Sequence, residues 1–202
     1  MFKLRYFLLT ILMLSAFAVQ AERPENVRGV YVNVWTMNAP AKFYSIVNNS
    51  LENGLNAIVC DYEGKSSKAY RQDLAYAKRE GLYCIARIVV FTDGVGATFK
   101  NVRNPENWSQ KQQWAKDCEK LGFSEVQFDY IRFADTGSHT DKKKEVVEEF
   151  LTEAKNNLGI PVGIDVFGSV AYQPRHTIGQ DLNRLANIVN VVSPMLYPSH
   201  FH

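Results

Sequence analysis

The chain has 202 residues, of which 46% are hydrophobic and 22% are charged, and its formal net charge is +2 at pH 7. That length suits one domain with a sizeable core, and the charge is too small for the basic surface of a nucleic-acid-binding protein. The three cysteines are odd in number and widely spaced, which argues against a disulfide framework. One bridge between Cys60 and Cys84 is conceivable, but three small buried thiols are the simpler interpretation.

The first 21 residues have the pattern of a secretory signal peptide. Lys3 and Arg5 precede an apolar run that ends in the small-residue sequence Val19-Gln20-Ala21. The run is shorter than the roughly 20 apolar residues of a membrane-spanning helix. The sequence therefore predicts cleavage after residue 21, a single domain over residues 22–202, no stable membrane anchor, and export to the periplasm or the exterior.

Strand-like and helix-like patterns alternate through the rest of the chain. Strands are expected over residues 30–35, 56–61, 83–91, 125–133, 161–167 and 188–196. Helices are expected over residues 41–52, 70–79, 108–121 and 142–158, with a short one around residues 178–185. Apolar strands that alternate with helices indicate a parallel sheet covered by helices. Without a dinucleotide-binding glycine motif after the first strand, the pattern favours an α/β fold of the (β/α)8 TIM-barrel type.

The number of units is smaller than in a complete barrel. A complete barrel has eight strands and typically about 250 residues. Here the sequence stops shortly after the sixth expected strand. We therefore expect about six β/α units, an incomplete barrel truncated after its sixth strand.

Side-chain alternation points two carboxylates into the barrel. On the fourth strand Val126 and Phe128 suit the helical side, which leaves Asp129 on the inner side. The same alternation on the fifth strand places Asp165 inside. Both residues lie near the C-terminal strand ends, where barrels of this type carry their active sites. Two carboxyl groups about 5–5.5 Å apart are the catalytic pair of a retaining glycosidase.

These residues have structural and functional interpretations. Asp129 is the expected nucleophile or transition-state stabiliser, although it could instead form an ion pair with Arg132 or Arg87. Asp165 is its expected catalytic partner. Asp61 either neutralises Arg87 or binds a sugar hydroxyl, and Arg87 either orients the carboxylates or contacts the substrate, because a charge within an apolar strand requires a partner.

Further substrate-binding candidates lie at or beyond the strand ends: Trp35, Tyr130, Arg132, Tyr197 and His200. Aromatic rings offer platforms for sugars, and Tyr197 is followed by Pro198, which stops the strand. His200 and His202 alone are too few for a metal site, so no metal and no cofactor are predicted.

Several motifs, taken together and in order, resemble a bacterial family of glycoside-hydrolase-like domains of formally unknown function. They include Gly122-Phe123 through Phe133, Asp165-Val166-Phe167-Gly168 and the run from Ser193-Pro194 to Ser199-His200. The resemblance covers essentially all of the chain after residue 21. It implies a β/α barrel that acts on a polysaccharide or a cell-surface glycan.

Two alternatives to an active glycoside hydrolase remain. One is a non-catalytic carbohydrate-binding remnant or an inactive fragment of such an enzyme. The other is a metal-dependent deacetylase that uses Asp and His. In the preferred interpretation the partner is a carbohydrate substrate, with no role for nucleic acid, and the sequence makes no prediction of oligomeric state.

Overall fold

The computed structural model describes residues 22–91, 97–173 and 175–198. The predicted signal peptide over residues 1–21 lies outside these ranges, as does His200. Within them, no helix is both long and apolar enough to cross a bilayer.

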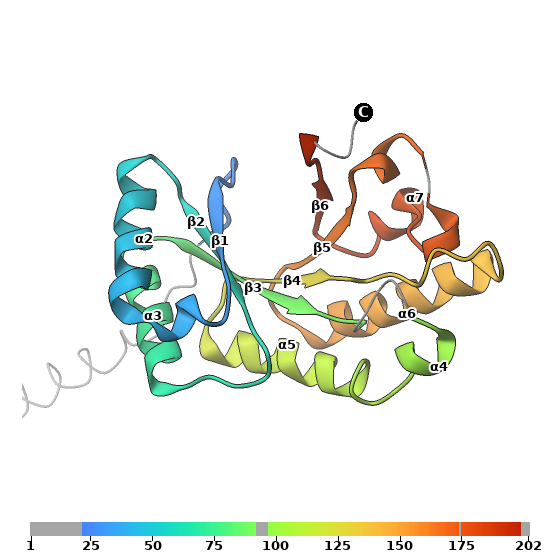
Figure 1. Ribbon diagram of the computed structural model, residues 1–202, viewed down its shortest axis with the longest axis horizontal. Helices are drawn as coiled ribbons and strands as arrows, with labels where there is room; N and C mark the ends of the chain where they lie inside the picture. Colours follow the sequence, from blue (N-terminus) through green and yellow to red (C-terminus); the bar gives the residue numbers. More distant parts are fainter. Residues whose placement is uncertain (1–21, 92–96, 174, 199–202) are drawn as a thin grey trace, which may run out of the picture.

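In the described part of the chain, six parallel strands form one sheet, and they lie side by side in chain order. The strands are β1 (Gly29–Val32), β2 (Ala57–Asp61), β3 (Tyr83–Val89), β4 (Glu125–Asp129), β5 (Val162–Phe167) and β6 (Val191–Met195). The sheet is curled, so that β1 and β6 rise on opposite sides of it (Figure 1). This topology, with helical segments between consecutive strands, confirms the prediction of a TIM-barrel type fold with about six β/α units.

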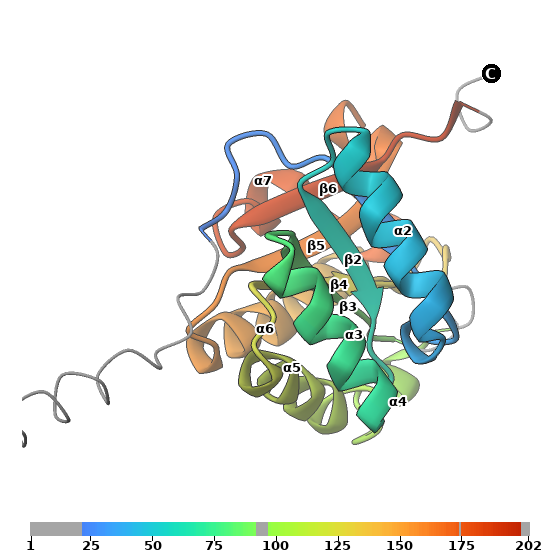
Figure 2. The same ribbon diagram turned by 90° about the vertical axis from the view of Figure 1, so that its left-hand side faces the viewer.

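Helices cover the outer side of the sheet (Figure 2). The longer ones in the described chain are α2 (Pro40–Glu52), α3 (Lys68–Arg79), α5 (Ser109–Leu121) and α6 (Thr140–Asn157). The shorter ones are α4 (Phe99–Val102), α7 (Leu182–Leu185) and the 3-10 turns η1 (Thr36–Asn38), η2 (Gly168–Ala171) and η3 (His176–Ile178). The sequence pattern does not predict α4, because four residues carry too little periodicity to be recognised.

Local side-chain chemistry sets some helix ends. The Ser67 hydroxyl accepts a 3.0 Å hydrogen bond from the amide of Tyr70 and caps the start of α3. Gly122 ends α5 with a φ of 86°, a conformation that glycine adopts without strain. The chain can therefore turn at once from α5 into β4.

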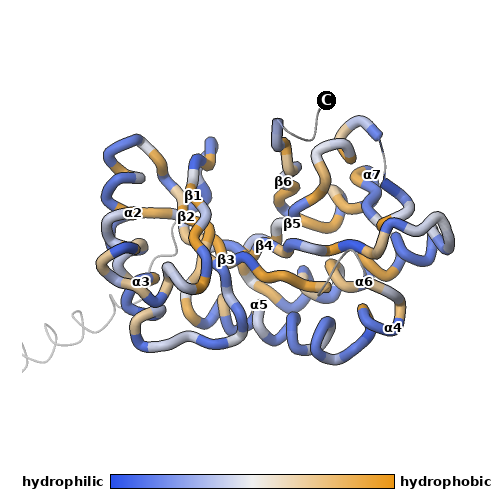
Figure 3. The backbone as a smooth tube through the Cα atoms, viewed as in Figure 1, coloured by the Kyte–Doolittle hydropathy of each residue, from blue (hydrophilic) through white to orange (hydrophobic). Residues whose placement is uncertain are grey.

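The two faces of the sheet are packed differently. On the outer face, Val126 and Phe128 are fully buried against the helices as part of the main hydrophobic core. On the inner face, Ala57, Tyr83 and Ile85 form a separate, smaller apolar cluster. Hydrophobic residues concentrate along the central strands (Figure 3). The predicted alternation of β4 residues between the two faces is therefore correct.

The segment before β1 covers the N-terminal end of the inner face. Arg23 Nε lies 3.1 Å from Glu125 Oε2, and the Tyr83 hydroxyl donates a 3.1 Å hydrogen bond to the same oxygen. Val27 packs against the apolar inner cluster. Burial raises the pKa of Glu125, and its contacts with Arg23 and Tyr83 oppose that rise. This carboxylate is thus enclosed, and its Oε2 has two partners.

Three strand boundaries differ from the sequence prediction by three or more residues. β4 ends at Asp129 and not at residue 133, because Tyr130 takes a φ of 55° and leaves the extended conformation. β1 ends at Val32, since the Asn33 side chain accepts a 2.9 Å hydrogen bond from the Thr36 amide and starts a turn. β6 begins at Val191 and not at residue 188. Apolar alternation continues through these segments, so the pattern alone could not mark their ends.

All three cysteines are free and buried. Cys60 and Cys84 lie on neighbouring strands but do not form the bridge that the sequence made conceivable. The simpler interpretation, three small buried thiols, is confirmed.

Candidate functional site

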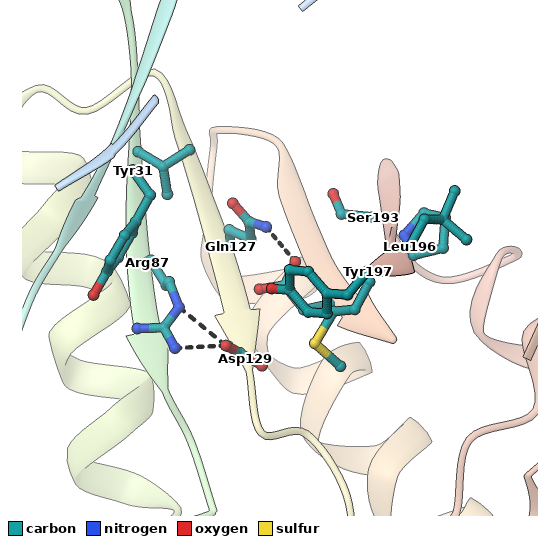
Figure 4. Close-up of a pocket in the computed structure, with 11 residues that line it drawn as sticks. Tyr31, Arg87, Gln127, Asp129, Ser193, Leu196 and Tyr197 are labelled. Atoms are coloured by element: carbon teal, nitrogen blue, oxygen red, sulfur yellow. Dashed lines mark hydrogen bonds and ion pairs between the residues drawn. The ribbon is translucent and has the colours of Figure 1, made fainter. Parts of the chain in front are cut away.

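A cavity of about 420 Å³ opens on the inner side of the sheet, toward the C-terminal ends of the strands. It is lined by Tyr31, Val59, Arg87, Gln127, Asp129, Asp165, Ser193, Pro194, Met195, Leu196 and Tyr197. Figure 4 shows the labelled side chains among them converging from β1, β3, β4 and the β6 end. The structure thus brings Asp129 and Asp165 together, as the alternation of β4 and β5 predicts.

Arg87 is the centre of the charge network. Its Nη2 and Nε lie 2.6 and 3.0 Å from Asp129 Oδ2, and its Nη1 lies 2.6 Å from Asp61 Oδ1. Burial lowers the pKa of Arg87, but the charges and hydrogen bonds of Asp129 and Asp61 outweigh it and raise the pKa above its ordinary value. Of the alternatives for Asp129, the ion pair with Arg87 forms, and Asp61 neutralises the same guanidinium.

Asp129 is held at both oxygens. Its Oδ2 accepts the two Arg87 bonds, and its Oδ1 accepts a 2.6 Å hydrogen bond from the Tyr130 amide. The left-handed conformation of Tyr130 is uncommon for a non-glycine residue. Together, the Arg87 and Tyr130 hydrogen bonds fix the plane of the Asp129 carboxylate.

Asp165 has a different environment. It is 8% exposed, and its Oδ1 accepts a hydrogen bond from the Gln127 amide nitrogen. Burial, and next the negative charge of Asp129, raise the pKa of Asp165 to about 7, while Gln127 and Arg87 partly oppose the rise. Near neutral pH, Asp165 is therefore a carboxyl group that can give or take a proton.

Gln180 supports Asp165 from outside the cavity. This buried side chain accepts a 3.1 Å hydrogen bond from the Phe167 amide and donates a 3.4 Å bond to the Asp165 carbonyl. It thereby ties the C-terminal end of β5 to the segment that follows η3. The backbone that carries Asp165 is fixed on both sides of Val166.

Sequence reasoning missed Tyr31 and Gln127 as site residues. The Tyr31 hydroxyl donates a hydrogen bond to Asp61 Oδ2, and its ring lies 5.3 Å from the Arg87 guanidinium carbon. Burial and then the bond to Asp61 raise the pKa of Tyr31 to about 12, so the phenol stays protonated. Both residues have the inward phase of their strands, and that phase was the signal that could have identified them.

Of the other expected binding residues in the described chain, only Tyr197 lines the cavity. Tyr197 lines the cavity and is 54% exposed. Trp35 is 81% exposed and lies in the turn before η1, outside the lining of the cavity. Tyr130 follows Asp129 and is 38% exposed, and Arg132 lies over the rings of Tyr130 and Phe167. Among the described residues, no group of three or more His, Cys, Asp or Glu side chains is arranged to hold a metal ion.

The fold and the site define a β/α-barrel protein whose candidate site is built on carboxylates at the C-terminal strand ends. The sequence gives the family. Residues 94–202, more than half of the chain, match the family described as "Putative glycosyl hydrolase domain", and the chain belongs to that family. The resemblance inferred from the motifs is confirmed. Comparison with curated proteins gives no match.

Solved structures share the fold. The spore cortex-lytic enzyme SleL of Bacillus cereus matches with a TM-score of 0.61 and 14% identity over 85% of this chain and 42% of that chain. The carboxyl transferase domain of Rhizobium etli pyruvate carboxylase matches with a TM-score of 0.55 and 12% identity, over 82% and 26%. A xylose isomerase domain protein of Planctomyces limnophilus matches with a TM-score of 0.50 and 13% identity, over 85% and 74%. The chain spans less than half the length of the first two, and at these identities the matches show the fold alone.

Proposed function

We propose that the protein is a glycoside hydrolase that acts on a polysaccharide or a cell-surface glycan. The observation that carries this proposal is one cavity with two unlike carboxyl groups: Asp129 is paired with an arginine, and Asp165 has a pKa of about 7. Glycosidases generally need one ionised and one protonated carboxyl group. Family membership supports the reaction class, and the structural likeness to the cortex-lytic enzyme SleL supports a glycan of the bacterial surface.

Asp165 is the proposed proton donor. Gln127 donates to Oδ1 of Asp165, which leaves Oδ2 to carry the proton. That proton passes to the glycosidic oxygen while the bond to the anomeric carbon breaks, and the leaving sugar departs as a neutral alcohol. A donor with a pKa of about 7 is well matched to a neutral environment.

Asp129 is the proposed nucleophile or charge stabiliser. In a retaining reaction its Oδ1 bonds to the anomeric carbon, and water, which loses a proton to Asp165, then releases the sugar. In an inverting reaction Asp129 takes the proton of the attacking water, which adds directly to the anomeric carbon. Arg87 orients the carboxylate in both cases, and the anomeric configuration of the first product distinguishes the two courses.

Tyr197 and Tyr31 are the proposed substrate platform. Both are more than half exposed and line the cavity, on the β6 and β1 sides respectively. Their rings can stack on the apolar faces of sugar rings, while Asp61 and Ser193 offer hydrogen-bond partners for hydroxyl groups. The cavity thus combines apolar surface with fixed polar groups, as saccharide sites do.

The test is release of reducing ends by the full-length protein from bacterial surface glycans and from α- and β-linked polysaccharides. We expect wild-type protein to release sugar from at least one glycan and Asp129→Asn to be nearly inactive on it. Asp141→Asn, at an exposed carboxylate on α6, is the matched control and should retain the wild-type rate. Equal rates for wild type and Asp129→Asn would remove Asp129 from the mechanism. Glycan binding without any release would support the carbohydrate-binding alternative and refute the enzyme.

Export and the domain boundaries belong to the same proposal. A signal peptide over residues 1–21 would deliver the domain of residues 22–202 to the compartment where surface glycans lie. Mass spectrometry of the secreted or periplasmic protein should find an N-terminus at Glu22. An uncleaved chain retained in the cytoplasm would contradict this part of the proposal.

A further inference from the structure

Arg132 is a half-buried guanidinium without a carboxylate partner. Its guanidinium carbon lies 5.5 Å from the centre of the Tyr130 ring and 5.0 Å from that of Phe167. Within the described ranges of the chain, its side chain forms no ion pair or hydrogen bond. Burial lowers the pKa of Arg132, which reflects the cost of removing its charge from water.

The other described arginines differ in this respect. Six of them form ion pairs with Asp or Glu: Arg23, Arg79, Arg87, Arg103, Arg175 and Arg184. Arg28 and Arg71 lack such a partner, but both are exposed and therefore remain hydrated. Arg132 alone among them combines partial burial with an unpaired charge, and such a charge is costly unless an anion compensates for it.

Arg132 does not itself line the cavity, but the two rings that it contacts belong to residues next to the cavity wall. Tyr130, under its guanidinium, directly follows Asp129, and Phe167 lies two residues beyond Asp165 on the same face of β5. Phe167 pairs in register with Met195, which lines the cavity. A sugar ring bound next to the two carboxylates would therefore bring its neighbouring substituents close to Arg132.

Two carboxylates, Asp129 and Asp135, act electrostatically on the Arg132 guanidinium, and each is paired with another arginine. Arg175, whose guanidinium lies 5.5 Å from the same Phe167 ring, is neutralised by Asp135 at 2.8 Å. Lys143 is buried, and its ammonium group donates to the carbonyls of Ala134, Thr136 and Thr177. The Arg132 guanidinium thus remains free to bind a ligand, and it offers a single positive charge on a planar group with parallel N–H donors.

We propose that Arg132 forms an anion-binding subsite that selects glycans with a carboxylate-bearing sugar. The inference rests on the proposed function, because it places the carboxylate next to the sugar that is cleaved. A planar guanidinium matches a carboxylate with two parallel hydrogen bonds, and a single free charge suits a monoanion better than a phosphate monoester. The flanking rings of Tyr130 and Phe167 fix the orientation of the guanidinium plane.

The first experiment compares one acidic glycan with its own neutral form. Oligogalacturonate and bacterial surface glycan are each divided, and in one half the carboxylates are reduced to alcohols. Binding of the full-length protein is measured by calorimetry, and cleavage by release of reducing ends. We expect wild type to prefer the acidic form about tenfold, the value of one charge-assisted hydrogen-bond pair. The preference should shrink as the salt concentration rises.

Variants assign the preference to Arg132. Arg132→Gln should bring the acidic-to-neutral ratio close to one, and Arg132→Lys should retain part of it because the charge remains without the fork. The matched control is Arg79→Gln, which removes an exposed arginine stacked 4.9 Å from the Tyr76 ring, and it should keep the wild-type ratio. Because the ratio compares two ligands on one protein sample, loss of folded protein does not alter it. If Arg132→Gln cannot be purified, the wild-type ratio, its salt dependence and Arg132→Lys still decide the question.

The outcomes separate the subsite from the enzyme. A wild-type ratio near one, or a preference that survives in Arg132→Gln, overturns the subsite even if glycans are cleaved. Arg132-dependent binding of acidic glycan without cleavage of any glycan supports the subsite and refutes the hydrolase. Preference for a phosphodiester-linked surface polymer over both carboxylate probes would overturn the assignment of a carboxylate.

Discussion

Strand β4 carries two buried carboxylates, one near each end of its inner face, and their surroundings are opposite. Glu125 at the N-terminal end is covered by the segment before β1 and receives Arg23 and Tyr83. Asp129 at the C-terminal end also receives an arginine, Arg87, but it lies in the wall of an open cavity. Similar ion pairs thus occur in a closed and in an accessible setting.

The difference shows that position along a barrel strand determines whether a carboxylate is enclosed or accessible to a ligand. At the N-terminal end, an arginine from outside the sheet closes over the carboxylate, and the pair contributes to stability. At the C-terminal end, the arginine comes from the adjacent strand and leaves one side of the carboxylate free for a ligand. The division agrees with the general rule that barrel chemistry lies at the C-terminal strand ends.

The largest expected effect is the difference between neutralising Asp129 and neutralising Glu125, four residues earlier on β4. Asp129→Asn should lower glycan cleavage by at least about a hundredfold, the scale for loss of one charged group that stabilises a transition state. Glu125→Gln should leave the rate within about threefold, since its partners lie at the far end of the inner face. Initial rates on the same glycan check this prediction. Equal losses in the two variants would show that the comparison reflects folding and not chemistry.

The second effect concerns the partner carboxyl group. A general acid with a pKa of about 7 must be protonated to act, so wild-type activity should fall as the pH rises through about 7. Asp165→Asn should lose most activity and should lack that alkaline limb. Because native Asp165 holds its proton up to about pH 7 while the unfolded chain releases it near pH 4, wild-type stability declines between those values. Urea unfolding at pH 5 and pH 8 should show the Asn variant relatively more stable at pH 8, and an unchanged pH profile would exclude Asp165 as the acid.

The third effect tests the closed end. Arg23→Gln leaves Glu125 buried without a counter-charge and should lower the free energy of unfolding at pH 7 by about 1–2 kcal/mol, below the value for a fully buried pair. The loss should shrink at acidic pH, because burial raises the pKa of Glu125 and the group then folds as a neutral acid. Denaturant unfolding at pH 7 and pH 4 measures both. An equal loss at the two pH values would mean that the charge of Glu125 plays no part.

The smallest effect concerns a buried carboxylate that has no partner in the described structure. Asp73 on α3 is fully buried, and neither of its oxygens has a hydrogen-bond partner in the described structure. Burial raises its pKa to about 6, so ionised Asp73 destabilises the fold progressively as the pH rises from about 4 to about 6. Asp73→Asn should therefore be more stable than wild type at pH 7 by on the order of 1 kcal/mol and similar to it at pH 4. Thermal melts at the two pH values suffice, and a loss of stability at pH 7 would reveal a partner for the carboxylate.

The sequence predicted the fold and the inward direction of the two acids for the same reason. Val126 and Phe128 are apolar, so alternation assigned Asp129 to the inner face, and a similar alternation on β5 assigned Asp165. The roles of both as catalysts stay predictions. The side-chain hydrogen bonds between strands could not be predicted. The bonds of Gln127 to Asp165 and of Tyr31 to Asp61 depend on the register of neighbouring strands, which the sequence does not specify. The place of Trp35 was also missed, because one Asn33 side-chain bond ends the strand.

The bend at Tyr130 also decides which way the later side chains face. Had β4 continued in extended form, strict alternation would have sent Ile131 and Phe133 toward the cup of the barrel and Arg132 toward the helices. After the left-handed residue the order is reversed: Ile131 and Phe133 are fully buried, and the Arg132 guanidinium lies over the ring of Phe167, which has the inward phase of β5. Because of this single unusual backbone angle, two apolar side chains fix the segment in the core, and the charged side chain between them stays half-buried.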